Sequence, residues 1–458
     1  MRIALVFPRT RYPSGQPPLG ILYLAAYLRQ QVDCEIDIID STFQRHPLTY
    51  METALKAKPY DLVGISVMTP MLNEAVFASR VAKGLAYDPL VVWGGPHPTV
   101  MPEQTMSYPE VDAICLGEGE ETFLELVQHG GNPQNVAGMW YRADGEIVRS
   151  PLHPMIEDIS RLPFPARDLI PMDEYIRAWY SLTAADPNLA GTSVIGSRGC
   201  PYSCTYCQPT LRQLFGRKVR RRRVDNVIAE LDHLKATYNI QAFMFEDDTF
   251  IANGEWAYEF CEKLRTSGLN LKWGCNVRAD LVRRDLLVAM RDAGLAQMNM
   301  GIESGSQRIL DEIYHKRITV EQVERAAAMA RELGIRVGGY FMLGAPTETI
   351  EEVRRTISFA ARLPIDEAAF NVTTPLPGTT LWEQTKDLIA SDLTQFDYYK
   401  APVYKAGKVI PARQLNLLKK WAYLRFYALT SRRAVRVAWN TLTKMAGWRK
   451  LLLRMKRF

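Results

Sequence analysis

Long hydrophobic runs are missing from this sequence, and with them the most direct sign of a membrane protein. No apolar stretch reaches the ~20 residues that a helix needs to span a bilayer. Residues 1–8, MRIALVFP, are too short for the hydrophobic part of a signal peptide and favour a buried strand that ends at Pro8. We therefore expect a cytoplasmic protein, of ordinary globular composition with 47% hydrophobic and 23% charged residues.

Cysteine is also scarce, at seven residues in 458, which does not suggest a disulfide framework without a secretory signal. Four of the seven are scattered, and we expect them to be core thiols: Cys34, Cys115, Cys261 and Cys275. The other three, Cys200, Cys204 and Cys207, share one loop with the spacing C-x3-C-x2-C. Three such thiolates can bind three irons of a cubane cluster and leave the fourth iron open. A structural zinc site normally needs a fourth protein ligand, and the nearest histidine, His233, is a full helix away.

Acidic side chains are absent from the last part of the chain. Between Tyr398 and Phe458 the sequence has sixteen Lys and Arg and no Asp or Glu, so a total net charge of +6 leaves −10 for the preceding residues. Apolar side chains recur here at helical spacing, at Leu417, Trp421, Leu424 and Ala428. We expect residues 412–430 to form a helix that packs on the body of the protein. Residues 431–458, basic with Trp and Leu, are expected to contact an anionic membrane or another polyanion.

The first 150 residues alternate strand-like and helix-like runs. Strands are expected at 3–7, 35–39, 62–67, 90–93 and 113–116, and helices at 20–30, 51–57, 72–86 and 120–128. This alternation predicts an α/β domain with a parallel sheet wound on both faces, of the flavodoxin or Rossmann-like kind, which binds ligands where its strands end. A hairpin that turns at residues 143–145 is expected to follow.

A second series of strands and helices follows a proline-rich stretch. Residues 151–190 contain six prolines and little periodicity, so we expect a linker there. From 191 to 385, strands are expected at 193–196, 242–245, 271–276, 297–302, 336–343 and 368–373. Six such repeats predict a partial (β/α)6 barrel with its chemistry at the carboxyl ends of the strands. Residues 386–458 are expected to form a basic, helical C-terminal region.

The cysteine loop resembles the signature of the radical S-adenosylmethionine (SAM) superfamily, C-x3-C-x-aromatic-C, with Tyr206 as the aromatic residue. The resemblance covers residues 191 to about 385. It implies that Cys200, Cys204 and Cys207 bind a [4Fe-4S] cluster, whose open iron is chelated by the amine and carboxylate of SAM. Reductive cleavage of SAM then gives a 5′-deoxyadenosyl radical. The same resemblance implies that Tyr206 lies near the adenine.

Further polar residues follow successive strands at positions that match the supporting residues of that family. Glu246 and Asp247 follow the second barrel strand, where the resemblance implies that carboxylates receive the methionine ammonium. Arg278 follows the third strand and is expected to pair with the SAM carboxylate or ribose. Glu303 and Ser304 follow the fourth strand, and Glu303 is expected to accept from the ribose hydroxyls or the amine. A lone Glu or Arg at a loop is more often a salt bridge, but the succession of strand ends favours a cofactor site.

The front domain looks like the cobalamin-binding domain that precedes the barrel in many radical SAM enzymes. Glycine-rich strand ends let the backbone approach a bulky nucleotide tail, and helix N-termini can receive its phosphate. The expected contacts are Gly20, Ser66, Thr69, Gly94, Gly95, His97, Gly117, Glu118 and Gly119. The D-x-H-x-x-G motif that supplies a cobalt ligand in other cobalamin proteins is missing, so we expect cobalamin to bind without a histidine on cobalt. The alternative is a Rossmann-like domain that has lost the cofactor and serves as structure.

Together these features predict a cobalamin-dependent radical SAM enzyme that methylates an unactivated carbon of a lipid, tetrapyrrole or natural product. A flavodoxin- or ferredoxin-type protein is the expected electron donor, and the basic end suggests peripheral contact with the inner membrane face. One alternative is a non-methylating oxidative cyclase of the anaerobic porphyrin-ester type. Another is an RNA-modifying methylthiotransferase, although the front domain lacks a second cysteine trio and nucleic acid is not an expected partner. A non-catalytic iron–sulfur or cobalamin carrier is the third.

Overall fold

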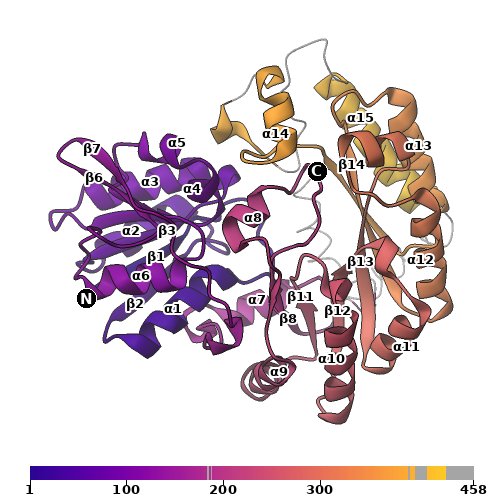
Figure 1. Cartoon of the computed structure of the whole chain (residues 1–458), viewed down its shortest axis with the longest axis horizontal. Helices are drawn as coiled ribbons and strands as arrows, with labels where there is room; N and C mark the ends of the chain where they lie inside the picture. The colour runs from indigo at the N-terminus through magenta and orange to yellow at the C-terminus, as the bar shows by residue number, and fades with distance from the viewer. Residues whose placement is uncertain (183–184, 187, 390–391, 398–409, 430–458) are drawn as a thin grey trace. The chain divides into compact units, whose positions relative to one another are not determined.

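The computed structural model describes residues 1–182, 185–186, 188–389, 392–397 and 410–429, and Figure 1 shows their course. These residues form two compact units. The first contains residues 1–175, 209–220 and 393–395, and the second contains the other described residues. Within the described ranges, no helix is both long and apolar enough to cross a membrane.

The first unit is built on a seven-stranded sheet in the order β2-β1-β3-β4-β5-β6-β7. The first five strands of this order are parallel, and β6 and β7 form an antiparallel hairpin at one edge. The order 2-1-3-4-5 is that of flavodoxin-like folds, so the predicted fold class of this domain is confirmed. The strands are β1 (Arg2–Phe7), β2 (Glu35–Asp40), β3 (Leu62–Ser66), β4 (Leu90–Gly94), β5 (Ala113–Cys115), β6 (Met139–Ala143) and β7 (Glu146–Arg149).

Helices cover both faces of this sheet. Helices α1 (Leu19–Gln31) and α6 (Gly119–Gln128) lie against one face, and α2 (Pro47–Lys56) and α3 (Leu72–Lys83) lie against the other. Strand β1 feeds both cores because successive side chains of a strand point to opposite sides. Ile3 and Leu5 belong to the core under α1 and α6, and Ala4 and Val6 belong to the core under α2 and α3.

The proline-rich stretch at 151–190 is more structured than a linker. It holds two short 3-10 helices, Ile159–Arg161 and Arg167–Leu169, and the helix α7 (Met172–Ala178). Tyr175 is fully buried, and its hydroxyl donates to Asp40 Oδ2 at 2.6 Å. The division between the two units therefore falls within this stretch, after Tyr175, and residues 151–175 belong to the first unit.

The second unit is built on a six-stranded parallel sheet in the order β15-β14-β13-β12-β11-β8. Neighbours in space are consecutive among these strands of the chain, as in a partial (β/α) barrel, so this part of the predicted fold is also confirmed. The strands are β8 (Gly191–Val194), β11 (Ala242–Phe245), β12 (Lys272–Val277), β13 (Leu295–Glu303), β14 (Arg336–Leu343) and β15 (Glu367–Val372). Between them run α9 (Val224–Tyr238), α10 (Gly254–Thr266), α11 (Arg284–Asp292), α12 (Val320–Glu332) and α13 (Ile350–Arg362).

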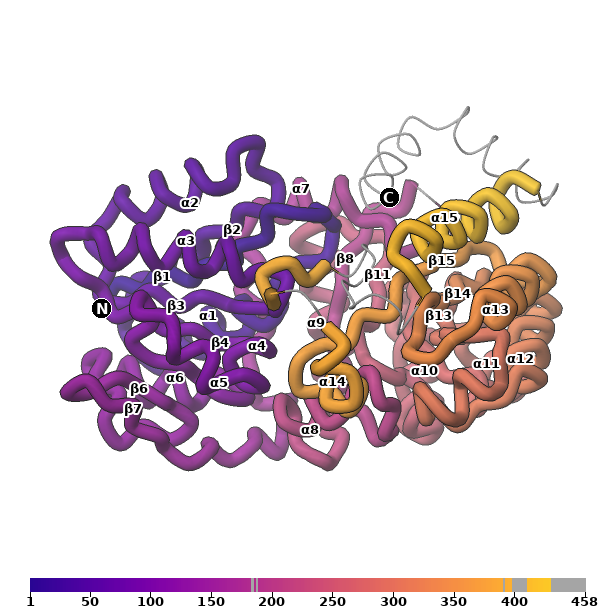
Figure 2. The backbone as a smooth tube through the Cα atoms, turned by 90° about the horizontal axis from the view of Figure 1, so that it is seen from above, coloured from indigo at the N-terminus to yellow at the C-terminus, as the bar shows by residue number. Residues whose placement is uncertain are grey.

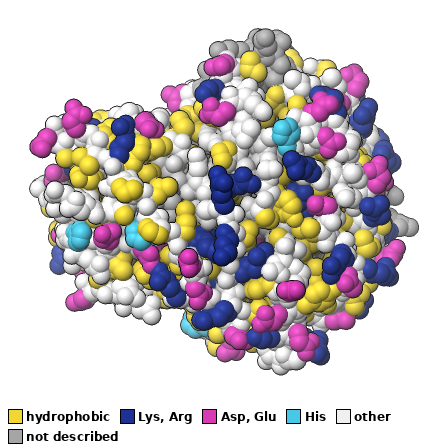
Figure 3. Space-filling view, viewed as in Figure 1, with side chains coloured by type: hydrophobic (Ala, Val, Ile, Leu, Met, Phe, Trp, Pro, Cys, Tyr) yellow, Lys and Arg dark blue, Asp and Glu magenta, His cyan; other side chains and the backbone are white. Residues whose placement is uncertain are grey.

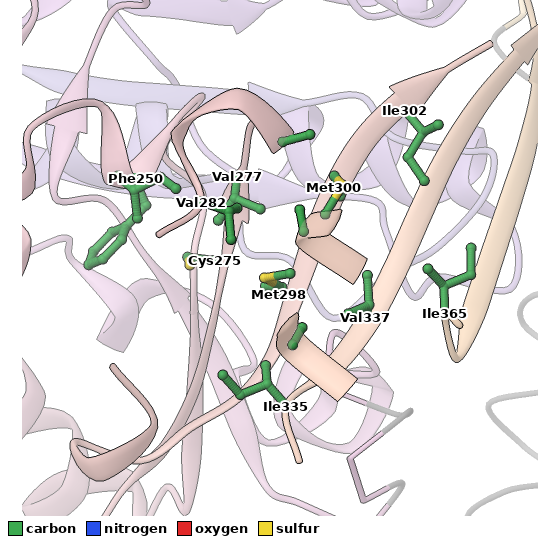
Figure 4. Close-up of a cluster of buried hydrophobic side chains, with 14 of the residues drawn as sticks. Phe250, Cys275, Val277, Val282, Met298, Met300, Ile302, Ile335, Val337 and Ile365 are labelled. Atoms are coloured by element: carbon green, nitrogen blue, oxygen red, sulfur yellow. The ribbon is translucent and has the colours of Figure 1, made fainter. Parts of the chain in front are cut away.

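Alternate residues of the barrel strands form the core between sheet and helices. Figures 1 and 2 both place α11, α12 and α13 along one side of β13 and β14. On β13 the side chains of Met298, Met300 and Ile302 belong to this core, and Figure 4 shows them with Cys275 and Val277 of β12. The intervening residues of each strand point to the opposite side, which is where polar groups gather toward the strand ends.

Helix α15 (Ala412–Tyr423) continues into a π-helical turn (Leu424–Ala428) and packs on the barrel, as expected. Its packed face, however, is not the stripe that the spacing suggested. Leu415, Ala422 and Phe426 are buried, whereas Leu417 and Trp421 are 61% and 42% exposed. The expected membrane contact through residues 431–458 lies outside the described residues.

Candidate cluster and cofactor sites

The cysteine loop follows β8 and is held by hydrogen bonds to a distant segment of the barrel. The Thr205 N–H donates to Tyr314 O at 3.0 Å, and the Thr205 hydroxyl donates to Ile313 O at 2.6 Å. Within the loop, the Cys207 N–H donates to Cys204 O at 3.1 Å. These bonds hold the chain between the second and third cysteines against the segment at residues 313 and 314.

The donor set of this loop fits an iron–sulfur cluster better than a single metal ion. Cys200, Cys204 and Cys207 are free thiols, and burial raises the pKa of Cys200 and Cys207. Within the described ranges, no three His, Cys, Asp or Glu side chains converge as ligands of one ion do. A cubane cluster places each cysteine on a different iron, so its sulfurs need not converge on one point. Binding of iron displaces the thiol protons that burial retains.

Arg278, which follows β12, is turned toward this loop. Its Nη1 donates to Cys204 Sγ at 3.7 Å, and its guanidinium carbon lies 3.7 Å from the centroid of the Tyr202 ring. The Nε and Nη2 groups donate to the two carboxylate oxygens of Asp280 at 3.1 and 3.2 Å. Nη2 also donates to Lys316 O at 2.7 Å. The cation therefore braces the loop from the end of the neighbouring strand.

Tyr206 and Glu303 meet at a third residue, Lys316, which the sequence did not single out. Lys316 Nζ donates to Glu303 Oε1 at 2.6 Å and to the Tyr206 hydroxyl at 3.0 Å. The Tyr206 hydroxyl also donates to Glu303 Oε1, at 3.2 Å. Burial, and then the charge of Glu303, raise the pKa of Tyr206. Lys316 lies 13 residues beyond the strand in a loop, so no local pattern pointed to it.

Glu303 is held in an uncommon backbone conformation that aims its carboxylate at this group. Its φ is +65°, and the register between β13 and β14 shifts between Gly301 and Glu303. A Cβ at Gly301 would lie 2.6 Å from Glu303 Oε1 and 2.7 Å from Lys316 Nζ, so a side chain there would displace the ion pair from its present position. Ser304 points elsewhere: it is fully buried, with its hydroxyl 3.1 Å from Thr356 Oγ1.

Three carboxylates follow β11, and they have different surroundings. Glu246 Oε1 accepts from the Ser193 hydroxyl at 2.6 Å, and buried Asp247 accepts from the Gly196 N–H and the Ser197 hydroxyl. Asp248 is exposed, and, after burial, its charge contributes to the raised pKa of Cys200 and Cys207. Enough protein surrounds it that desolvation raises its own pKa to about 6.

The sequence-based choice of Glu246 and Asp247 did not include Asp248, the third carboxylate after β11. Asp248 lies three residues beyond the end of β11, where strand alternation no longer applies, so no local pattern pointed to it. Asp247 instead bonds the backbone that leads into the cysteine loop, and burial raises its pKa to about 6 as well.

In the first unit, the loops after β3 and β4 are tied together at the carboxyl edge of the sheet. The Val67 N–H donates to Gly94 O at 2.8 Å, and the His97 N–H donates to Val67 O at 3.0 Å. Gly95 adopts φ +92°, and a Cβ there would lie 3.3 Å from Val67 N and 3.4 Å from Ser66 Oγ. A side chain at residue 95 would crowd Val67 and Ser66 and strain the backbone, so the close approach of these two loops requires glycine.

His97 is fully buried, and both of its ring nitrogens have protein partners. Nδ1 lies 3.0 Å from Thr69 Oγ1, and Nε2 lies 2.8 Å from Gln104 Oε1. Burial lowers the pKa of His97, which keeps the ring neutral. Neither nitrogen is free to bind a metal, so the residues present fit a cobalamin without a histidine on cobalt. Gln104 is the partner that the sequence did not indicate.

Glu118, expected to contact a cofactor, forms a buried ion pair. Arg220 donates to its two carboxylate oxygens at 2.6 and 2.9 Å, and both side chains are almost fully buried. Arg220 also donates to Ile156 O and Phe215 O, at 2.6 and 2.9 Å. The pair joins the loop after β5 to the end of residues 209–220, which include α8 (Thr210–Phe215).

The remaining expected contacts are glycines near the same sheet edge. Gly117 has φ +74°, and its N–H donates to Thr99 Oγ1 at 3.0 Å. Gly119 begins α6, and a Cβ there would lie 3.7 Å from Cys115 Sγ. Gly20 lies in the first turn of α1 with open space beside it. These positions leave the backbone accessible at the strand ends.

Comparisons with known proteins match both units. Residues 194–360 match the Radical SAM superfamily, and residues 9–127 match the B12 binding domain. An uncharacterized methyltransferase of Pyrococcus horikoshii is 36% identical over 444 residues, which cover 93% of this chain and 92% of that protein. The anaerobic magnesium-protoporphyrin IX monomethyl ester cyclase of Rubrivivax gelatinosus is 30% identical over 424 residues, covering 88% and 74%.

Solved structures share the fold. The cobalamin-dependent SAM radical enzyme OxsB, with aqua-cobalamin and SAM bound, superposes with a TM-score of 0.74 at 19% identity, over 99% of this chain and 75% of that one. The radical SAM methyltransferase TsrM of Kitasatospora setae, with cobalamin and a [4Fe-4S] cluster, gives a TM-score of 0.70 at 19% identity, over 85% and 76%.

Proposed function

Because this chain belongs to the cobalamin-dependent radical SAM enzymes, we propose that it transfers a methyl group to an unactivated carbon of a small-molecule substrate. Its cofactors are a [4Fe-4S] cluster, SAM and cobalamin. When bound, these groups supply a hydrogen-abstracting radical and a transferable methyl group. The observation that carries the proposal is the combination of two features in one chain. One is the set of three free thiols on a loop of the barrel. The other is the flavodoxin-like sheet with glycines at its strand ends, where His97 bonds to Thr69 and is not available to cobalt.

We assign the cluster to Cys200, Cys204 and Cys207, and the recognition of SAM to the strand ends beside them. Asp248 offers an exposed carboxylate to the methionine ammonium, and partly buried Glu246 follows the same strand, β11. A cationic partner favours the ionised form of Asp248, which desolvation alone disfavours.

Tyr206 and Glu303 serve the nucleoside part of SAM. Lys316 and the Tyr206 hydroxyl both bond Glu303 Oε1, so Oε2 is the oxygen offered to ribose hydroxyls. The ion pair also holds the tyrosine ring in place, which leaves its face for the adenine.

We assign cobalamin to the carboxyl edge of the first sheet. Gly94, Gly95 and Gly117 bring bare backbone to the cofactor, and Ser66 and Thr69 lie on the neighbouring strand end. His97 keeps the loop after β4 in shape through Thr69 rather than binding cobalt.

The methyltransferase reading is supported by the Pyrococcus relative, which is named a methyltransferase, and by the fold shared with TsrM. The cyclase relative supports the alternative of an oxidative ring closure on a tetrapyrrole. An RNA-modifying methylthiotransferase has less support, because cysteines of a second trio are missing from the front domain. The substrate class remains a lipid, tetrapyrrole or natural product in this proposal.

The test is a product analysis on protein purified without oxygen and loaded with iron, sulfide and hydroxocobalamin. With SAM and dithionite we expect both 5′-deoxyadenosine and S-adenosylhomocysteine. The triple variant C200A/C204A/C207A should lose iron and both products, whereas Cys34→Ala, at a thiol outside the loop, should keep them. Deoxyadenosine without S-adenosylhomocysteine would favour the cyclase. Full activity in the triple variant would refute the site.

We further propose that the protein works in the cytoplasm, takes its electron from a flavodoxin- or ferredoxin-type donor, and contacts an anionic membrane through α15. On the face shown in Figure 3, Lys and Arg side chains lie among Asp and Glu. Residues 412–429, by contrast, contain no acid and expose Leu417, Trp421 and Leu424 on one side of a helix. An apolar stripe with Trp between basic side chains suits the interface of an anionic bilayer.

A further inference from the structure

We propose that Arg278 sets the reduction potential of the cluster through a charged hydrogen bond to Cys204, and that it is a positioning residue rather than a ligand of SAM. The inference rests on the proposed binding of the cluster by Cys204. It concerns the electron-accepting step and is independent of which substrate the enzyme uses.

The guanidinium of Arg278 is fixed from several directions. An arginine has five N–H donors. One on Nε and one on Nη2 go to Asp280, the second on Nη2 goes to Lys316 O, and one on Nη1 goes to Cys204 Sγ. The Tyr202 ring lies against the guanidinium, with the ring centroid 3.7 Å from the guanidinium carbon. With the Arg278 side chain only 7% exposed, water competes little for these contacts.

These commitments leave one N–H, on Nη1, for any further partner. Arginine usually recognises a carboxylate with two parallel N–H groups. Here Asp280 already takes the pair from Nε and Nη2, so the SAM carboxylate cannot receive the same fork. The sequence led us to expect that Arg278 pairs with the SAM carboxylate. This geometry assigns Arg278 to Cys204 instead.

A buried cation with an N–H donor on a cluster sulfur favours the reduced state. Each one-electron reduction adds a negative charge to the cluster, and reduction potentials respond to net charge, hydrogen bonds to the sulfurs and exposure. The low effective dielectric of the site strengthens these terms. Asp280 acts in the opposite direction, because its carboxylate partly neutralises Arg278 while remaining 21% exposed itself. Arg278 therefore raises the reduction potential of the cluster, and Asp280 lowers it.

The experiment is a redox titration of the cluster by electron paramagnetic resonance in the full chain, without SAM. Arg278→Gln keeps an N–H donor but loses the charge, and should lower the ratio of reduced to oxidised cluster at a fixed potential about tenfold, equal to about 59 mV for one electron. Arg278→Lys should shift the ratio less. Asp280→Asn should shift it in the opposite direction, toward easier reduction.

The control is a second arginine–aspartate pair with the same spacing. Arg283 and Asp285 are 3.2 Å apart but 60% and 64% exposed, so Arg283→Gln should leave the potential unchanged. Equal shifts in the same direction for Arg278→Gln and Asp280→Asn, or no shift at full iron content, would overturn the proposal.

Two outcomes separate this inference from the proposed function. If the unaltered protein takes up no cluster, the proposed site fails, and the inference about Arg278 fails with it. If Arg278→Gln alone loses iron, the sign of the Asp280→Asn shift decides, and a shift toward harder reduction counts against the inference.

Discussion

Removal of Arg220 should destabilise the first unit more than any loss at the surface, because it strands a buried carboxylate. In the structure Arg220 makes two bonds to Glu118 and one each to Ile156 O and Phe215 O. Breaking a buried pair by removing one partner costs about 3–5 kcal/mol. We expect Arg220→Met to fall in this range. Glu118→Gln keeps one oxygen that can accept from Arg220, and Arg220 keeps its bonds to Ile156 O and Phe215 O. This change should therefore cost about 1–3 kcal/mol.

The double variant R220M/E118Q gives the sharper test. It removes the unpaired buried charge, so its free energy of unfolding should exceed that of Arg220→Met by at least about 1 kcal/mol. Such a difference shows that the two changes are coupled. The exposed pair Lys56 and Glu52 is the control, since such pairs contribute about 0–1 kcal/mol. A chain of two units does not unfold in one step, so hydrogen exchange of the β1–β5 amides is the appropriate measurement.

The opposite pattern would refute this reasoning. If the double variant is as unstable as the sum of the single changes, the two side chains do not interact as the distances indicate. If Glu118→Gln leaves the exchange rates unchanged but abolishes cobalamin retention, Glu118 is a cofactor contact, as the sequence suggested, and the ion pair is secondary.

Two other predictions concern the barrel unit. Glu348, which accepts from the Gly344 and Ala345 N–H groups, has its pKa raised from 4.5 to about 7 by burial, so the folded state retains the proton that the unfolded state loses. Stability should therefore fall as pH rises from about 4.5 to about 7, by on the order of 3 kcal/mol. Glu348→Gln should flatten that slope, measured by hydrogen exchange of the barrel-strand amides at pH 5 and pH 8 after correction for intrinsic rates, and an unchanged slope would contradict the assignment. In sedimentation with vesicles, the full chain should bind phosphatidylglycerol better than phosphatidylcholine, and L417N/W421N should weaken binding at least threefold, about 0.7 kcal/mol; equal binding to both lipids would exclude the membrane role.

The elements that the sequence predicted best are strands whose apolar runs have clear ends. Strands β11 and β14 begin and end where the pattern placed them, because polar residues or glycine follow their apolar runs, at Glu246 and Gly344. The order of the strands followed from short βα units, which permit few topologies. The short helices within 151–190 were not predicted, because the prolines obscured the pattern of apolar residues such as Tyr175, which is buried.

The site was harder to predict wherever partners come from distant parts of the chain. Lys316 reaches Glu303 from a loop, and Arg220 reaches Glu118 across about a hundred residues, so no spacing rule connects them. Helix α15 illustrates a different difficulty. It carries apolar side chains on two faces, and periodicity alone does not tell which of them meets the barrel.

The two opposite charges near the cysteine loop, on Arg278 and Asp248, have different surroundings and different proposed partners. Arg278 is buried, and its N–H groups donate to the protein backbone and to Cys204, a proposed ligand of the cluster. Its positive charge therefore stabilises the negative charge of the cluster. Asp248 is exposed, so a cation from solution can reach it. SAM carries both an ammonium and a sulfonium, and it should meet the carboxylate rather than the guanidinium. Because different side chains face the two charges, substrate binding and reduction of the cluster can be altered separately in this enzyme, which a shared arginine would not allow.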